Sequence, residues 1–131
     1  MSNLALTKEV SGKIEDVVAI VTDAIKPAGF GVLTRIDFDK KLKEKIGETI
    51  KPCVILGACN PSLAFKAYQQ SSDAALLIPC NIVLTEISPG KVRIEAIKPT
   101  KMLGILPAIK LSDEVQSVEL ALERCFESLN A

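Results

Sequence analysis

The feature that most constrains the fold of this chain is a pair of strand-like segments, residues 81–87 and 91–98, separated by Pro89-Gly90. In the second segment, apolar residues alternate with charged residues such as Arg93, which is the period of a half-buried strand. The Pro-Gly dipeptide is typical of a tight turn between two such segments. We therefore expect a β-hairpin here, in a sheet that is at least partly antiparallel.

Three more segments have the composition of strands, namely residues 3–10, 30–38 and 53–59. The first alternates loosely, and the second is rich in β-branched residues and follows Gly29. The third reads Cys-Val-Ile-Leu-Gly-Ala-Cys and is apolar on both faces. Such a strand is expected in the middle of a sheet, where both faces are covered.

Helical spacing of apolar residues predicts four helices between and after the strands. Ser11 is the expected N-cap of the first helix, and Asn60-Pro61 suits the N-cap and first turn of the third. The expected helices cover residues 14–25, 38–46, 61–70 and about 112–129.

The second expected helix is short and ends at Gly47. Phe38, Leu42 and Ile46 share one side of it, and we expect this side to be buried. The dense basic run at residues 39–45 is interpreted as the solvated side of the same helix rather than an anion-binding patch.

The length of 131 residues fits a single domain, residues 1–131. An apolar fraction of 48% is enough for a substantial core. The order of strands and helices predicts an α+β fold: a two-layer sandwich in which a mostly antiparallel sheet has helices packed on one face.

The segment 98–110 is apolar but contains two prolines and a glycine, so we expect a loop there. Its residues Met102, Leu103, Ile105 and Leu106 need cover. The sequence leaves three alternatives open: the loop folds over the core, forms the lid of a pocket, or contacts a partner.

Composition excludes several classes of function. Acidic and basic residues number 16 each, which argues against nucleic acid as the main partner. The chain has no histidine, so it lacks the commonest general base and the commonest nitrogen ligand for metals. An enzyme built on this chain would have to use Cys, Lys, Tyr or carboxylates.

No apolar run approaches the roughly 20 residues of a membrane-spanning helix. The first residues also lack the basic start and apolar stretch of a secretory signal. We therefore expect a cytoplasmic protein without a membrane partner, in which the four cysteines are thiols rather than disulfides.

Cys59 is the first candidate for chemistry because it precedes Asn60-Pro61. If Asn60 caps the following helix, Cys59 lies just outside the positive end of that helix, where a thiol can have a lowered pKa. The alternative is that Cys59 is a small apolar residue in the core, as is expected for Cys53 and Cys125.

Cys80 is the second candidate, and two arrangements relative to Cys59 are open. If residues 74–79 form a strand parallel to residues 53–59, Cys80 emerges at the same end of the sheet as Cys59. If a strand instead begins at Cys80, we expect it to start at the opposite end, which would make a pair impossible. Pro79 leaves this local geometry undecided.

Two stretches, residues 56–68 and 76–103, resemble the family known as domain of unknown function 302. The shared motifs are a Cys-Asn-Pro followed by an Ala-rich helix, a Leu-Pro-Cys-Asn-Val-like run, and an Asp-Pro-x-x-Met-Leu-like run after a hairpin. In this chain they correspond to Cys59-Asn60-Pro61, Ile78-Pro79-Cys80-Asn81-Ile82 and Lys98-Pro99-Thr100-Lys101-Met102-Leu103.

Among the departures from these motifs, Ile82 replaces Val and Lys98 replaces Asp. The resemblance implies a small two-layer α+β fold, related in outline to the TATA-binding-protein class, and a cytosolic bacterial or archaeal protein that forms a homodimer. It implies no established activity.

Three functions remain open. The first is a binding module for a small ligand or a soft metal ion, in which the ligand contacts Cys59, Asn60, Pro61, Cys80 and Asn81, and Cys59 and Cys80 hold the metal. A structural zinc site is not expected, since the chain has no Cys-x-x-Cys pair.

The second function is a thiol-based redox protein or enzyme with Cys59 as the nucleophile and Cys80 as the resolving thiol. The third is a homo-oligomeric interaction module that uses the apolar loop and a sheet edge, without chemistry of its own. The sequence names no cofactor.

Overall fold

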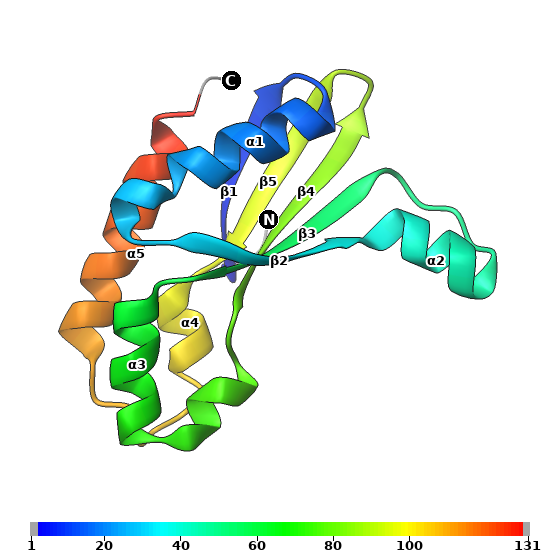
Figure 1. Cartoon of the computed structure of the whole chain (residues 1–131). Helices are drawn as coiled ribbons and strands as arrows, with labels where there is room; N and C mark the ends of the chain where they lie inside the picture. The colour runs from blue at the N-terminus through cyan, green and yellow to red at the C-terminus, as the bar shows by residue number, and fades with distance from the viewer. Residues whose placement is uncertain (1–2, 130–131) are drawn as a thin grey trace.

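The computed structural model describes residues 3–129 (Figure 1). In chain order its elements are Ala5–Ser11 (β1), Ile14–Ala24 (α1), the 3-10 turn Lys26–Ala28 (η1), Gly31–Asp37 (β2), Phe38–Ile46 (α2), Cys53–Cys59 (β3), Pro61–Gln70 (α3), the 3-10 turn Ser72–Leu76 (η2), Cys80–Ser88 (β4), Lys91–Ile97 (β5), Pro99–Leu103 (α4) and Ser112–Glu127 (α5).

The strands form one five-stranded sheet in the order β1-β5-β4-β3-β2, and each neighbouring pair is antiparallel. β4 and β5 are the predicted hairpin, with Pro89-Gly90 between them. β3 lies inside the sheet, between β4 and β2, as its apolar composition predicted. The predicted α+β class is therefore confirmed.

One face of the sheet is buried and the other is not. Val54, Leu84 and Ile94 lie opposite one another on β3, β4 and β5, and each is at most 4% exposed. Ile55 and Val83, the next pair along these strands, point to the other face and are only half-buried. The helices α1 and α5 cover the buried face (Figure 1), so the predicted two-layer arrangement is confirmed.

A second, smaller cluster of buried residues lies beyond one end of the sheet, where α3 and α4 pack together (Figure 1). It contains Leu63 and Ala67 of α3, Met102 and Leu103 of α4, and Val115 of α5. The segment 98–110, predicted as a loop, thus begins with a short helix whose apolar residues build this cluster.

The helix α2 is present as predicted, but its predicted buried side is wrong. None of its residues is buried: Phe38 is 37% exposed and Ile46 is 65% exposed. The reason is its position. α2 contacts the ends of β2 and β3 and projects away from the other helices (Figure 1).

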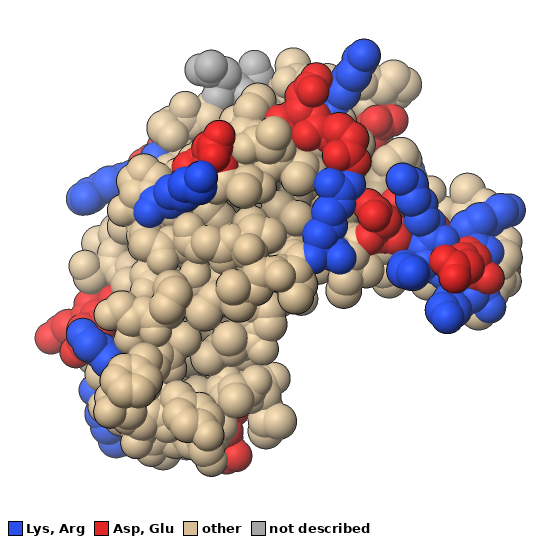
Figure 2. Space-filling model, viewed as in Figure 1, with Lys and Arg blue, Asp and Glu red and all other residues tan. Residues whose placement is uncertain are grey.

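The lysines and Glu44 of α2 are exposed and Asp39 is half-buried, so this projecting helix carries charges of both signs (Figure 2).

The predicted cap of the first helix is also wrong. Ser11 is the last residue of β1, where it pairs with Lys91, and the N-cap position of α1 is Lys13. Pairing with β5 extends β1 beyond the point at which the serine suggested a helix start. Gly47, in contrast, ends α2 in the left-handed conformation as expected (φ 73°).

Candidate functional site

The two candidate cysteines lie at the same end of the sheet, one at the end of β3 and the other at the start of β4. Cys59 is the last residue of β3, and Cys80 is the first residue of β4 and pairs with Ala58. Residues 74–79 form no strand, so the parallel arrangement is wrong.

The prediction that a strand beginning at Cys80 would separate the two cysteines is wrong as well. β3 and β4 run antiparallel, and a strand antiparallel to its neighbour begins where that neighbour ends.

Cys59 and Cys80 both line a small cavity between this end of the sheet and the helices α3 and α4. The cavity has a volume of about 20 Å³, which is room for roughly one water molecule or one ion. Its lining is almost entirely apolar and consists of Phe30, Ala58, Cys59, Asn60, Leu63, Ala64, Ala67, Ile78, Cys80, Pro99, Met102 and Leu103.

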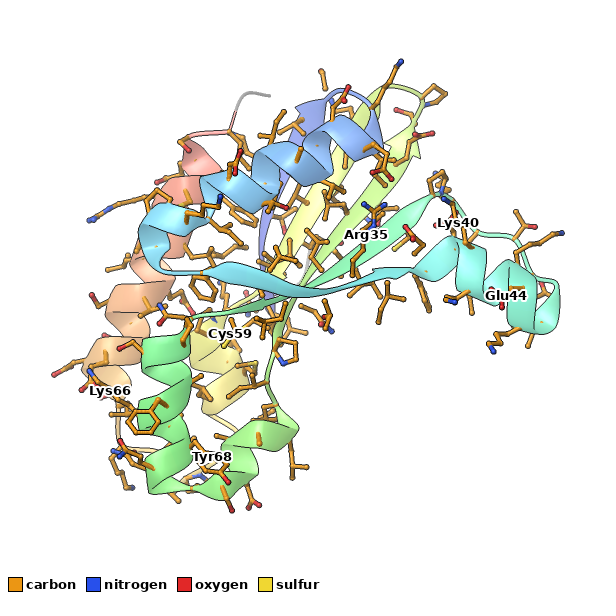
Figure 3. All side chains as sticks on the ribbon, viewed as in Figure 1. Arg35, Lys40, Glu44, Cys59, Lys66 and Tyr68 are labelled. Atoms are coloured by element: carbon orange, nitrogen blue, oxygen red, sulfur yellow. The ribbon has the colours of Figure 1, made fainter. Side chains whose placement is uncertain are left out.

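Asn60 fixes the wall of the cavity that α3 forms, and its predicted role as N-cap is confirmed. Its Oδ1 accepts a hydrogen bond from the backbone N–H of Leu63 at 3.1 Å. Its Nδ2 donates to the backbone carbonyl of Ala28 at 3.1 Å. One side chain thus caps α3 and ties it to the turn before β2, which positions Cys59 one residue upstream (Figure 3).

Pro61 and Asn81, the other residues predicted to contact a ligand, are placed differently. Pro61 is the first residue of α3, and the exposed Asn81 pairs with Gly57. Neither lines the cavity. Their role in ligand binding therefore stays a prediction.

Met102 belongs to the site, although the sequence indicated only an apolar residue that needed cover. Its Sδ lies 3.7 Å from Sγ of Cys80, and its side chain lines the same cavity. The signal that could have suggested this role is the soft sulfur of methionine, which is also a donor to soft metals. Met102 was not predicted as part of the site because it is 22 residues from Cys80 in the sequence.

The thiols of the site are poorly acidic. Burial, together with the nearby Cys59, raises the pKa of Cys80 to about 11. Burial also raises the pKa of Cys59. The expectation that the start of α3 lowers the pKa of Cys59 is therefore wrong, because Cys59 is buried and loss of hydration disfavours its thiolate.

The other two thiols lie elsewhere. Cys125 packs in the main core on α5, as its helical spacing predicted. Cys53 begins β3 at the far end from Cys59, and its sulfur lies 3.9 Å from the hydroxyl of Thr85. All four cysteines are free in the structure.

Within residues 3–129, no three or more His, Cys, Asp or Glu side chains are grouped so that they could hold a metal ion. A metal at the cavity would have to use the two thiols and a further donor of another kind. None of the helices in this part of the chain is long and apolar enough to cross a membrane.

Comparison with known proteins identifies the family. A model of the family described as "Domain of unknown function DUF302" matches residues 6–129. The chain belongs to the DUF302 family. No curated protein matches the chain.

A solved structure shows the same fold in a relative of this DUF302 domain. It is the crystal structure of an uncharacterized conserved DUF302 protein from Bacillus stearothermophilus, which is 28% identical. The match covers 96% of this chain and 98% of that one, with a TM-score of 0.82. Neither finding carries an activity, so the function has to be argued from the cavity.

Proposed function

We propose that this DUF302 domain is a binding module for a soft metal ion, with Cys59 and Cys80 as its thiolate ligands. The observation that carries the proposal is their meeting at one cavity: the antiparallel pairing of β3 and β4 brings both cysteines to the same end of the sheet. Thiolates are the ligands that soft metal ions prefer.

The size of the cavity favours an ion over an organic ligand. Pockets for drug-sized ligands have volumes of about 300–1,000 Å³, whereas this cavity has about 20 Å³. A ligand of several heavy atoms would have to displace the buried side chains of Leu63 or Met102. An ion needs no such displacement.

The register of the two strands favours a shared ion over a disulfide. Cys80 lies opposite Ala58, so Cys59 is one residue out of register with it. A disulfide requires the sulfurs to approach to about 2.05 Å with converging Cβ atoms. An ion bound at about 2.3 Å from each sulfur joins atoms roughly 3.8–4.6 Å apart, about twice the sulfur–sulfur distance of a disulfide.

The acidity of the thiols also supports metal binding over thiol catalysis. A cysteine nucleophile reacts as the thiolate and is found where its pKa is lowered. The pKa of Cys59 is raised, and that of Cys80 is raised to about 11. A metal ion can displace these protons because its bond to sulfur drives the deprotonation.

The test uses the reduced full-length chain under anaerobic conditions, with Ag(I) as a soft probe that undergoes no redox cycling. We expect one equivalent to remain bound after gel filtration. Unfolding should then shift upward, since a ligand present at 100 times its Kd stabilises a protein by about 2.7 kcal/mol.

Cys59→Ser and Cys80→Ser should each lose the retained metal. Cys53→Ser is the matched control, because Cys53 lies on the same strand but at its other end. Wild-type protein that retains no metal would refute the proposal, and so would equal losses in all three variants.

We also propose that two copies of the chain associate through the region around β2. On the uncovered face of the sheet, Ile36, Ile55 and Val83 form an apolar row across β2, β3 and β4. The adjoining α2 exposes Phe38 and Ile46. Both apolar patches adjoin β2. A two-fold axis beside β2 would therefore place the patches of one copy against those of the other, so that each copy covers the apolar residues of its partner.

Sedimentation velocity tests this association at about 50 µM, a concentration at which even micromolar pairs form. We expect a dimer for the wild type and a monomer for Ile46→Lys, whose own fold should be unaffected because Ile46 is 65% exposed. A monomeric wild type contradicts the proposal.

A further inference from the structure

A third sulfur atom, that of Met102, lies at the cavity next to the thiol of Cys80. The sulfurs of Met102 and Cys80 lie 3.7 Å apart and face the same cavity as Cys59. Met102 is 6% exposed, so its thioether is held at the cavity rather than in solvent. The following inference rests on the proposed function and concerns the identity of the ion and its third ligand.

The position of Met102 is fixed by contacts outside the cavity. It lies on α4, which begins with Pro99 and is bonded to α5 by Glu119. Oε1 of Glu119 accepts hydrogen bonds from the backbone N–H of Thr100 at 2.9 Å and from its hydroxyl at 2.7 Å. The backbone N–H of Met102 donates to the carbonyl of Lys98 at 3.0 Å. The hydrogen bonds of Glu119 thus anchor α4 to α5, and the bond to Lys98 holds Met102 in the first turn of α4.

The separation of the two sulfurs matches that of two donors on one ion. Donors about 2.3 Å from a d¹⁰ ion lie roughly 3.8 Å apart at a tetrahedral angle and about 4.6 Å apart at a linear one. The 3.7 Å from the donor Sγ of Cys80 to the acceptor Sδ of Met102 is a hydrogen-bond distance that is close to the tetrahedral value. An ion could therefore bind both sulfurs with little movement of either side chain.

We propose that the ion is Cu(I), held by the thiolates of Cys59 and Cys80 and by the thioether of Met102. Soft thiolate and thioether ligands favour Cu(I), zinc and iron–sulfur clusters, and iron–sulfur clusters take four protein ligands, mostly Cys thiolates. Structural Zn(II) takes four ligands, usually Cys, His, Asp or Glu. No such group of even three exists within residues 3–129.

The binding step involves no electron transfer, because copper enters and remains as Cu(I). Two S–H bonds break, two Cu–S(thiolate) bonds and one Cu–S(thioether) bond form, and two protons pass to solvent. The thioether carries no proton and no charge, so Met102 adds a bond without adding to the proton release. This distinguishes Met102 from a third cysteine.

The sequence provides an unusually clean test of the third bond. The chain contains two methionines, Met1 and Met102. Replacing both with selenomethionine places a selenium atom at Met102. X-ray absorption at the selenium edge of the copper-loaded, reduced, full-length chain then reports any selenium–copper bond. In the Met102→Leu variant, selenium remains only at Met1, so this variant is the matched control.

We expect a selenium–copper distance of bonding length in the wild-type sequence and none in Met102→Leu. In competition with a chromophoric Cu(I) chelator, Met102→Leu should bind Cu(I) at least about tenfold more weakly, since even residues that only support metal ligands change affinity by 10–100-fold. Leucine conserves the volume of methionine, so the fold should be retained. If that variant nevertheless fails to fold, the selenium measurement on the wild-type sequence still decides.

Each other outcome has a definite meaning. Copper bound through Cys59 and Cys80 with no selenium–copper bond overturns the role of Met102 and leaves the proposed function standing. Zn(II) that displaces Cu(I) from the wild type at equal concentrations overturns the assignment of copper. A wild type that binds neither Ag(I) nor Cu(I) overturns the proposed function together with this inference.

Discussion

Replacing Asn60 should destabilise the domain by a predictable amount, because one side chain makes two separate hydrogen bonds. Loss of an N-cap costs about 1 kcal/mol, and loss of a further, part-buried hydrogen bond costs about 0.5–1.5 kcal/mol. In Asn60→Ala, the bonds to Leu63 and Ala28 are both absent. We therefore expect a loss of about 2 kcal/mol.

Asn60→Asp separates the two contributions. The carboxylate can still accept the hydrogen bond from the backbone N–H of Leu63, and its charge is favourable at the start of α3. It cannot donate to the carbonyl of Ala28. The expected loss is about 1 kcal/mol, which is close to half the loss in Asn60→Ala.

The assay is urea unfolding followed by circular dichroism, with thermal unfolding as a second measurement. An unfolding entropy of about 2.1 cal/mol/K per residue over 131 residues amounts to about 0.28 kcal/mol/K. A loss of 2 kcal/mol should then lower Tm by about 7 °C. Asn81→Ala is the control, because Asn81 is exposed and its loss should cost less than about 0.5 kcal/mol. The reasoning is refuted if Asn60→Ala behaves like Asn81→Ala, or if Asn60→Asp is no more stable than Asn60→Ala.

Two further predictions concern the neighbourhood of the cavity. In Gly57→Ala, the new methyl group would lie 2.7 Å from Cγ of Pro79 and still closer to the hydroxyl of Thr34. We therefore expect the free energy of unfolding, measured with urea, to fall by about 1–3 kcal/mol. Unchanged stability would show that Pro79 is not packed against β3. Cu(I) affinity should rise with pH, because Cys80, with a pKa of about 11, is protonated at pH 7 and each of the two thiols must release a proton. The increase should approach about 100-fold per pH unit between pH 6.5 and 7.5 in chelator competition, and an affinity independent of pH would contradict two neutral thiols as ligands.

Local patterns in the sequence predicted the parts of the fold that depend on neighbouring residues. Alternation and the Pro89-Gly90 turn were enough for the β4–β5 hairpin. The preferences of helix starts were enough for Asn60 as a cap. Features of this kind are determined by residues that are close together in the sequence.

The errors arose where the cause is distant in the chain. The spacing of Phe38 and Ile46 predicted an amphipathic helix but did not say whether another element would cover its apolar side. Ser11 looked like a cap because nothing in its own segment reveals the pairing with Lys91.

The candidate site was predicted only in part. The sequence identified Cys59 and Cys80, but whether they meet depends on the direction of β4 relative to β3. Met102 was missed as a donor because it reaches Cys80 only after the hairpin and α4 have turned the chain back toward the cavity. Predicted helix-end acidification of Cys59 failed because burial was not visible in the sequence.

The central claim is that Cys59 and Cys80 bind one soft ion together, and mapping of thiol protection tests it most directly. The reduced chain is treated with a small alkylating reagent at pH 8, with and without one equivalent of Cu(I), and each cysteine is quantified by mass spectrometry. We expect copper to protect Cys59 and Cys80 and to leave the alkylation rates of Cys53 and Cys125 unchanged. Protection of only one of the pair, or equal protection of all four cysteines, contradicts the claim.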